Sequence, residues 1–154
     1  RKIVLVSLGG IESKNIPVTA LLKDKSFHWL VNIELSTITD NIHSTYSIQD
    51  CLYRDLIASV DAVVSKPGYG TAAEVVKYQL PFLFTCRGDF PDEPFIVSWL
   101  ESHSRSKEIS KNEWLSGNFE NYLTKLIIEP QKKQINCNGA EIAAKIIHDN
   151  YLNR

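Results

Sequence analysis

Short apolar runs rich in Val, Ile, Leu and Phe alternate along this chain with longer stretches of helical periodicity. Apolar runs of this kind are typical of strands buried on both faces, and such strands form parallel sheets with helices on either side. The alternation therefore predicts an α/β fold: a doubly wound, Rossmann-like parallel sheet in three layers, α/β/α. A chain of 154 residues fits one such domain and can bury a core without disulfides or metals.

The periodicity predicts six strands and six helices. The predicted strands cover residues 2–8, 27–33, 43–47, 62–65, 81–86 and 106–109. The predicted helices cover residues 17–23, 51–59, 71–78, 93–101, 112 or 117 to 128, and 139–151. Three of these helices have apolar residues that we expect to face inward: Leu52, Leu56 and Ile57; Phe95, Ile96, Trp99 and Leu100; and Ile142, Ala143, Ile146 and Ile147.

Composition narrows the class of protein. A net charge of −1 and a pI near 6.5 give no basic face for nucleic acid. The cysteines are odd in number and widely spaced, at Cys51, Cys86 and Cys137, which favours a reducing cytoplasm over a disulfide framework or a metal site. No apolar run reaches transmembrane length, and no signal peptide is visible. Because the chain begins directly on a strand and contains no Met, we expect a single domain, residues 1–154, excised from a longer polypeptide.

The most informative segment for function runs from Ser65 to Glu74, between a predicted strand and a predicted helix. Gly68 and Gly70 lack a Cβ, which allows a tight turn and the close approach of a ligand. Thr71 is a suitable N-cap, and Glu74 stands three residues later, as a capping box requires. The amides and dipole of such a helix start attract anions. The segment therefore predicts binding of a phosphate-bearing ligand.

This segment resembles the donor-site motif of GT-B glycosyltransferases through Lys66, Pro67, Gly68, Gly70, Thr71 and Glu74. It is closest to the branch that contains the N-acetylglucosaminyltransferase of peptidoglycan synthesis. It is also similar to the glycosyltransferase-like domain fused to some plant sugar kinases, especially over residues 89–95. The resemblance is best from about Ile48 to Leu100.

The resemblance implies the C-terminal half of a two-domain GT-B enzyme that transfers a hexosyl group. This half would hold a nucleotide-sugar donor, with UDP as the default nucleotide. An N-terminal acceptor domain, in the same or a partner chain, would bring the acceptor and the catalytic base, so the isolated domain would be inactive. The resemblance implies no metal and no cofactor other than the donor substrate. It leaves the sugar, the acceptor and the stereochemical outcome open.

The resemblance also assigns roles to single residues. The glycine-rich turn, including Tyr69, would meet the donor diphosphate, and Glu74 would bind the ribose hydroxyls. Ile48, after the third predicted strand, would lie next to the nucleotide base of the donor. Asp92 and Glu93 match an acidic or amide pair that touches the transferred sugar, and Arg87, close by, would bind the sugar with them. Lys66 departs from the pattern, since many relatives carry a histidine there, but a cation at this position could still face a phosphate of the donor.

Simpler interpretations stay open for each of these residues. Gly68, Gly70 and Thr71 could form a plain strand-to-helix turn, and Glu74 could serve only as part of the cap. Lys66 could be a solvated lysine and Ile48 a core isoleucine. Arg87 could pair with phosphate or with a neighbouring carboxylate. Asp92 and Glu93 could simply be the acidic first turn of a helix.

The predicted topology adds Gly9 and Gly10, which follow the first strand. In a doubly wound sheet the first and fourth strands are neighbours, so these glycines would converge with the turn at 67–70 and the segment 87–93 on one crevice. The sequence indicates no catalytic triad. Two alternatives to the transferase remain: a hydrolase or epimerase of nucleotide sugars, and a non-enzymatic nucleotide-binding or docking domain fused to another activity such as a sugar kinase.

Overall fold

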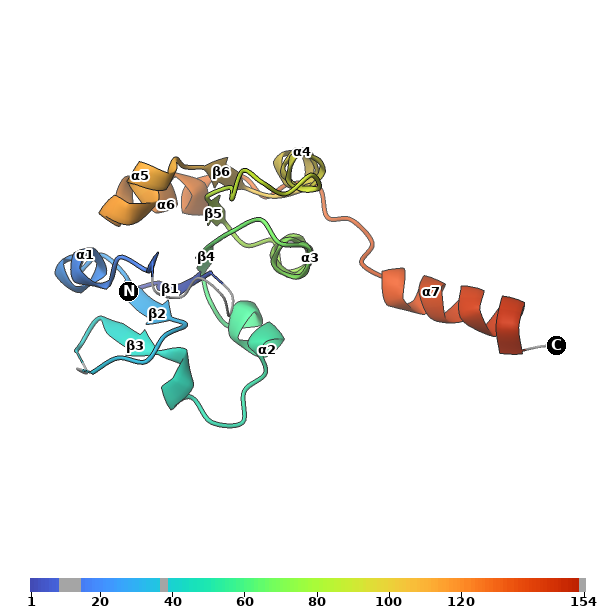
Figure 1. Cartoon of the computed structure of the whole chain (residues 1–154), viewed down its shortest axis with the longest axis horizontal. Helices are drawn as coiled ribbons and strands as arrows, with labels where there is room; N and C mark the ends of the chain where they lie inside the picture. The colour runs from blue at the N-terminus through green and yellow to red at the C-terminus, as the bar shows by residue number, and fades with distance from the viewer. Residues whose placement is uncertain (9–14, 37–38, 153–154) are drawn as a thin grey trace.

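A computed structural model of the chain describes residues 1–8, 15–36 and 39–152 (Figure 1). Its six strands form one all-parallel sheet in the order β3-β2-β1-β4-β5-β6. The strands are β1 (Ile3–Ser7), β2 (His28–Val31), β3 (Ile42–Ser44), β4 (Ala62–Ser65), β5 (Phe82–Phe84) and β6 (Ser106–Glu108). The predicted doubly wound sheet, and the adjacency of the first and fourth strands, are confirmed.

Helices cover both faces of the sheet, which gives the predicted three layers (Figure 1). On one face lie α1 (Val18–Lys23), α5 (Lys111–Ser116) and α6 (Glu120–Ile128), and on the other lie α2 (Tyr53–Ala58), α3 (Tyr69–Lys77) and α4 (Glu93–His103). Strand β1 shows why: Val4 and Val6 belong to the first core cluster, whereas Leu5 belongs to the second. Successive side chains of a strand point to opposite faces, so an all-apolar strand needs helices on both.

Two predicted boundaries near β3 are wrong. The third strand ends at Ser44, and Thr45–Ser47 forms a 3₁₀ helix, because the Ser44 side chain accepts a hydrogen bond from the Tyr46 amide and turns the chain. Helix α2 begins at Tyr53, which leaves Leu52 at its N-cap and exposed rather than inward. In α4, Ile96 and Leu100 are buried as predicted, but Phe95 is 77% exposed.

The predicted helix that ends at Ile128 is two helices, α5 and α6, separated at Gly117. Gly117 has a φ of +68°, the left-handed conformation that commonly ends helices. Ser110 and Glu113 form a capping box at the start of α5. The side chain of Ser110 accepts a hydrogen bond from the Glu113 amide, and the Glu113 carboxylate accepts one from the Ser110 amide.

Helix α7 (Gly139–Ile147), with the π-helical turn His148–Leu152, lies apart from the sheet at the end of an extended segment (Figure 1). None of its residues is buried, and Ile142, Ile146 and Ile147 are 51%, 54% and 53% exposed. The prediction that these residues face inward is wrong for this chain alone. Across the described ranges, no helix has both the length and the apolar character needed to span a membrane.

Candidate functional site

Two cavities open at the carboxyl ends of the strands, where ligands of doubly wound sheets bind. The first, which we call the β1–β4 cavity, has a volume of about 210 Å³ and is lined by residues that include Ser7, Asn32, Ser65, Lys66, Gly68 and Thr71. The second, the β5 cavity, has a volume of about 340 Å³ and is lined by residues that include Lys66, Thr85, Arg87, Asp89, Phe90 and Lys111. Lys66 lines both cavities, so they adjoin.

Helix α3 begins earlier than the sequence predicts. Its N-cap is Gly68, and Thr71 lies inside the first turn without a side-chain capping bond. The capping box of Thr71 and Glu74 is therefore wrong, because the helix already starts with the hydrogen bond from the Ala72 amide to the Gly68 carbonyl. A glycine N-cap offers no side-chain acceptor, so the first amides of α3 remain available to an external ligand.

Gly68 and Gly70 leave room for a ligand because they lack a Cβ; neither is required by its backbone conformation. Gly68 has a φ of −89°, and neither residue is among those with positive φ. Apart from the adjoining backbone, no atom of the described residues lies within 4 Å of the position that a Cβ would take at either residue. The two glycines therefore leave the start of α3 open to the close approach of a ligand.

Glu74, on α3, has a carboxylate oxygen that makes no hydrogen bond with the described residues. The Oε2 atom of Glu74 is buried and has no hydrogen-bond partner among the described residues. Its nearest cation is Lys77, whose Nζ lies 4.0 Å away from it. A buried carboxylate oxygen without a hydrogen bond is costly, so it is available to a donor that the ligand would supply.

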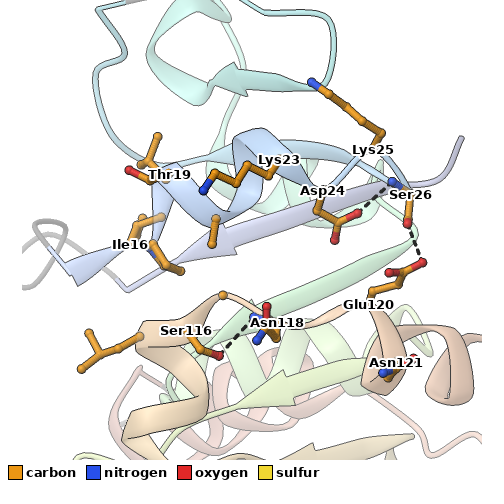
Figure 2. A pocket seen from close by; sticks show the side chains of 15 residues that line it. Ile16, Thr19, Lys23, Asp24, Lys25, Ser26, Ser116, Asn118, Glu120 and Asn121 are labelled. Carbon is orange, nitrogen blue, oxygen red and sulfur yellow. Dashed lines mark hydrogen bonds between the residues drawn. The ribbon is translucent and has the colours of Figure 1, made fainter.

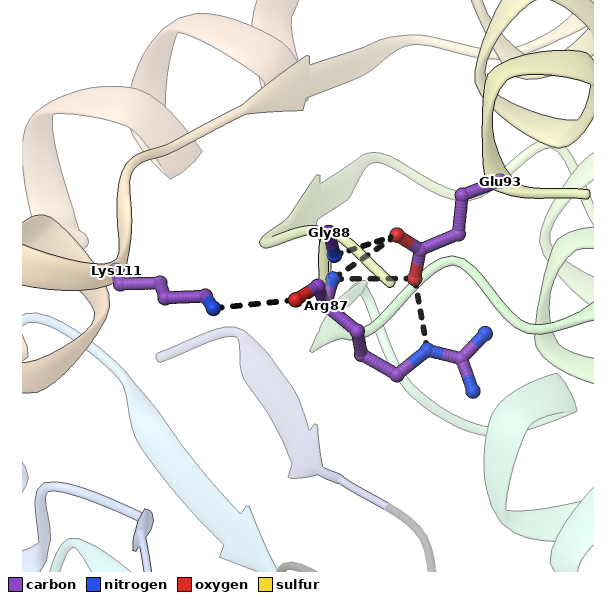
Figure 3. A network of polar contacts seen from close by, with 4 residues as sticks. All are labelled: Arg87, Gly88, Glu93 and Lys111. Carbon is purple, nitrogen blue, oxygen red and sulfur yellow. Dashed lines mark hydrogen bonds and ion pairs between the residues drawn. The ribbon is translucent and has the colours of Figure 1, made fainter. Parts of the chain in front are cut away.

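Arg87 and Glu93 form a tight network in the loop between β5 and α4 (Figure 3), and Arg87 lines the β5 cavity. The Nε of Arg87 donates to Oε1 of Glu93 at 2.7 Å, and the amides of Arg87 and Gly88 donate to the same carboxylate. Burial alone would raise the pKa of Glu93, but these hydrogen bonds outweigh burial, so its pKa lies below the usual value. The pairing of Arg87 with a neighbouring carboxylate, one of its two predicted roles, is therefore present.

The other predicted residues lie around this edge of the sheet. Ile48 is 40% exposed and Tyr69 is 67% exposed, so the interpretation of Ile48 as a core residue is wrong. Asp92 is the N-cap of α4, where it makes no side-chain capping bond. Gly9 and Gly10 lie outside the described residues.

The structure brings in residues that the sequence interpretation missed. Ser7 and Ser65 end β1 and β4, Asn32 follows β2, and the hydroxyl of Tyr53 donates to Ser7 Oγ at 3.2 Å. Lys111 donates from its Nζ to the Arg87 carbonyl at 3.1 Å. The signal that could have found the first three is a polar residue at the end of each apolar run, since those ends share one edge of a parallel sheet.

Cys86 also lines the β5 cavity. Burial, followed by the neighbouring Glu108 carboxylate, raises the pKa of its thiol to about 12. A thiol with so high a pKa is not a nucleophile at neutral pH. In the described parts of the chain, no three His, Cys, Asp or Glu side chains form a group that could hold a metal ion.

A larger groove of about 1080 Å³ lies elsewhere, between α1 and the turn that joins α5 to α6 (Figure 2). Its charged side chains include Lys23, Asp24, Lys25 and Glu120, so both signs are mixed along it. Ser26 donates to Glu120 across it at 2.6 Å. Size alone would favour this groove, but the adjoining cavities at the strand ends combine the start of α3 with three lining cations, and Glu74 follows on the same helix. We therefore place the candidate site at the strand ends.

Comparison with solved structures decides the fold family. Residues amounting to 99% of this chain superpose on 42% of CalG4, the calicheamicin glycosyltransferase, with a TM-score of 0.69 and 15% identity. The chain has the fold of one half of a GT-B glycosyltransferase. The glycosyltransferase of kitacinnamycin gives a TM-score of 0.61 at 17% identity over 84% of this chain and 36% of that one. The glycosyltransferase SnogD from Streptomyces nogalater gives a TM-score of 0.54 at 15% identity, over 96% of this chain and 43% of SnogD.

The GT-B fold is accompanied by a closer match in sequence. Over 106 residues, 69% of this chain, the sequence is 33% identical to L-arabinokinase of Arabidopsis thaliana, and the match spans 10% of that protein. The predicted similarity to a plant sugar kinase is thus confirmed. No protein-family model matches the chain. This chain spans less than half the length of each of these relatives.

Proposed function

We propose that this chain is the donor-binding domain of a glycosyltransferase and that it binds a nucleotide sugar, with UDP as the nucleotide. The donor diphosphate would lie against the first amides of α3 at Gly68–Thr71, beside Lys66. Glu74 would accept hydrogen bonds from the ribose hydroxyls, and Ile48 would lie next to the nucleotide base. The transferred sugar would extend toward the β5 cavity, near Asp92.

The observation that carries this proposal is the buried Oε2 of Glu74, which has no hydrogen-bond partner among the described residues. It lies on the helix whose N-terminus opens into the β1–β4 cavity. A ribose supplies two hydroxyl donors, and a diphosphate supplies the negative charge that a helix start attracts. One nucleotide diphosphate would satisfy both groups.

A partner domain follows from the same proposal. The solved glycosyltransferases that share the fold are more than twice as long as this chain, which covers 36–43% of them. Half-exposed isoleucines on α7 give this domain an apolar face, and no residue of that helix is buried. We propose that an N-terminal acceptor domain, in the same or a partner chain, completes the enzyme and covers such surface.

A second candidate function has its own observation. The 33% identity to a segment that makes up 10% of L-arabinokinase favours a domain fused to a sugar kinase, where it would bind a nucleotide or dock another domain without transferring sugar. The sequence flanking this domain discriminates the two proposals: a second Rossmann-like domain upstream favours the transferase, and a kinase domain downstream favours the fusion.

A thermal-shift panel tests nucleotide binding. We expect UDP and UDP-sugars to stabilise this chain more than NAD or ATP does, because the site offers a diphosphate cradle next to a ribose acceptor. At about a hundred times its dissociation constant, a ligand should add roughly 2.7 kcal/mol to the free energy of unfolding. The absence of any response to pyrimidine diphosphates at millimolar concentration would contradict the proposal.

Replacement of Glu74 by Gln should weaken UDP binding by on the order of 1–3 kcal/mol and leave the fold intact. Gln keeps the shape of the side chain but loses the charged pair of acceptors. Calorimetric titration with UDP measures the loss, and Glu101→Gln, an exposed change on α4, is the matched control. Equal affinities of wild type and Glu74→Gln would leave Glu74 without a role in the ligand site.

A further inference from the structure

The loop between β5 and α4 is organised around one buried carboxylate. Glu93, the first residue of α4, is 3% exposed. Its oxygens accept hydrogen bonds from the Arg87 amide at 3.0–3.1 Å, from the Gly88 amide at 3.0 Å and from Arg87 Nε at 2.7 Å (Figure 3). These donors occupy both oxygens of a side chain that has almost no surface, so little capacity remains for the hydroxyls of a sugar.

In this network the two terminal guanidinium nitrogens of Arg87 make no hydrogen bond with the described residues. Only the Nε of its guanidinium donates to a described residue, and Figure 3 shows the two terminal nitrogens pointing away from the Glu93 carboxylate. The guanidinium carbon of Arg87 lies 3.2 Å from the centroid of the Phe90 ring. This contact fixes the orientation of the planar, fork-shaped guanidinium. An arginine held in this way presents two parallel N–H donors, the geometry that suits a phosphate.

The loop is tied from its other side as well. Lys111, the first residue of α5, donates from Nζ to the Arg87 carbonyl at 3.1 Å (Figure 3). Arg87, Lys111 and Lys66 all line the β5 cavity, and Lys66 also lines the β1–β4 cavity at the start of α3. Three cations therefore line the region from the start of α3 to the β5 cavity, where Asp89 is the acidic residue of the lining.

We infer that Glu93 is a positioning residue: it holds the fork of Arg87 over the β5 cavity, where Arg87 binds the second phosphate of the donor. Glu93 itself does not contact the sugar. This inference rests on the proposed function, since it takes the nucleoside diphosphate as the ligand. It replaces the role in sugar binding that the resemblance implied for Glu93 and Arg87.

The first experiment needs no ligand. Amide hydrogen exchange, followed by NMR, should show Arg87 and Gly88 protected in the wild type and exchanging at least about tenfold faster in Glu93→Gln, because the amide group of Gln has only one acceptor for these donors. Glu101→Gln is the matched control and should change nothing. Unchanged exchange at Arg87 and Gly88 in Glu93→Gln would overturn the positioning role whatever the ligand is.

The second experiment compares UMP with UDP by calorimetric titration. Glu93→Gln should weaken UDP binding about tenfold and UMP binding less than about twofold, because only UDP carries the second phosphate. Arg87→Lys, which keeps the charge but loses the fork, should have the same selective effect. The double variant should lose no more than either single variant, since both remove one interaction.

Lys111→Met changes an exposed side chain, so the folding of this variant does not depend on a buried ion pair. It should weaken the binding of UDP about threefold and leave the binding of UMP unchanged. Equal loss for UMP and UDP in these variants, or additive losses in the double variant, would overturn the inference while the proposed function stands. If wild-type protein binds neither nucleotide, the proposed function fails and the phosphate role of Arg87 fails with it. The exchange experiment still decides whether Glu93 holds the loop.

Discussion

Supplied with a UDP-sugar and a panel of acceptors, this chain alone is expected to release UDP and form glycoside no faster than the uncatalysed reaction. The proposed donor site supplies diphosphate binding but neither a site for the acceptor nor a group to deprotonate it. Positioning of two reactants is worth roughly 7–11 kcal/mol of a barrier, and general base catalysis contributes about 10²–10⁴-fold. Loss of both leaves a domain that binds donor without transferring it.

The measurement is a transfer assay that detects UDP and glycoside, with this chain run beside a two-domain protein that contains it. Calorimetric titration of UDP in the same preparation is the control for folding and donor binding. Transfer by this chain at a rate comparable to that of the two-domain protein would contradict the need for an acceptor domain.

Replacement of Gly117 by Ala should lower the free energy of unfolding by about 2–4 kcal/mol, through two effects. A Cβ at Gly117 would lie 2.6 Å from the Cβ of Ala20 on α1 and 3.2 Å from Pro17, so α1 and the turn between α5 and α6 would have to separate. The φ of +68° adds strain for any residue with a Cβ. Overpacking of this kind typically costs about 1–3 kcal/mol, and the left-handed backbone about 1 kcal/mol more.

Urea unfolding followed by circular dichroism measures this change. Gly139→Ala is the matched control, because the residue begins α7 and, apart from the adjoining backbone, no atom of the described residues lies within 4 Å of a Cβ there. We expect no loss of stability from the control. Equal midpoints for Gly117→Ala and the wild type would show that the contact between α1 and the turn can relax without cost.

Much of the fold follows from local patterns in the sequence. The apolar runs of β1 and β4 require helices on both faces, which predicts a parallel sheet. That the two strands are neighbours follows from the doubly wound order assumed for such a sheet. The segment from Lys66 to Glu74 also predicted the edge of the sheet at which the candidate site lies, because polar and glycine-rich loops after buried strands converge there.

The errors have physical causes that a single sequence does not reveal. Thr71 and Glu74 have capping-box spacing, but Gly68 starts the helix three residues before Thr71, so the pattern falls inside the first turn. The hydrogen bonds from the Arg87 and Gly88 amides to Glu93 depend on the shape of the loop, which spacing does not specify. The isoleucines of α7 have the spacing of a helix face that is normally buried. Such spacing shows that one face is apolar but does not identify the surface that covers it.

Helix α7 has a consequence for its own helix–coil equilibrium. A helix of nine residues is too short to be stable in water on its own, and in proteins most helical stability comes from packing of an apolar face. The sheet domain provides α7 with no buried contact. Whatever surface covers Ile142, Ile146 and Ile147 must therefore supply the free energy that keeps the last turns of this chain helical, so that docking and helix formation there become a single equilibrium.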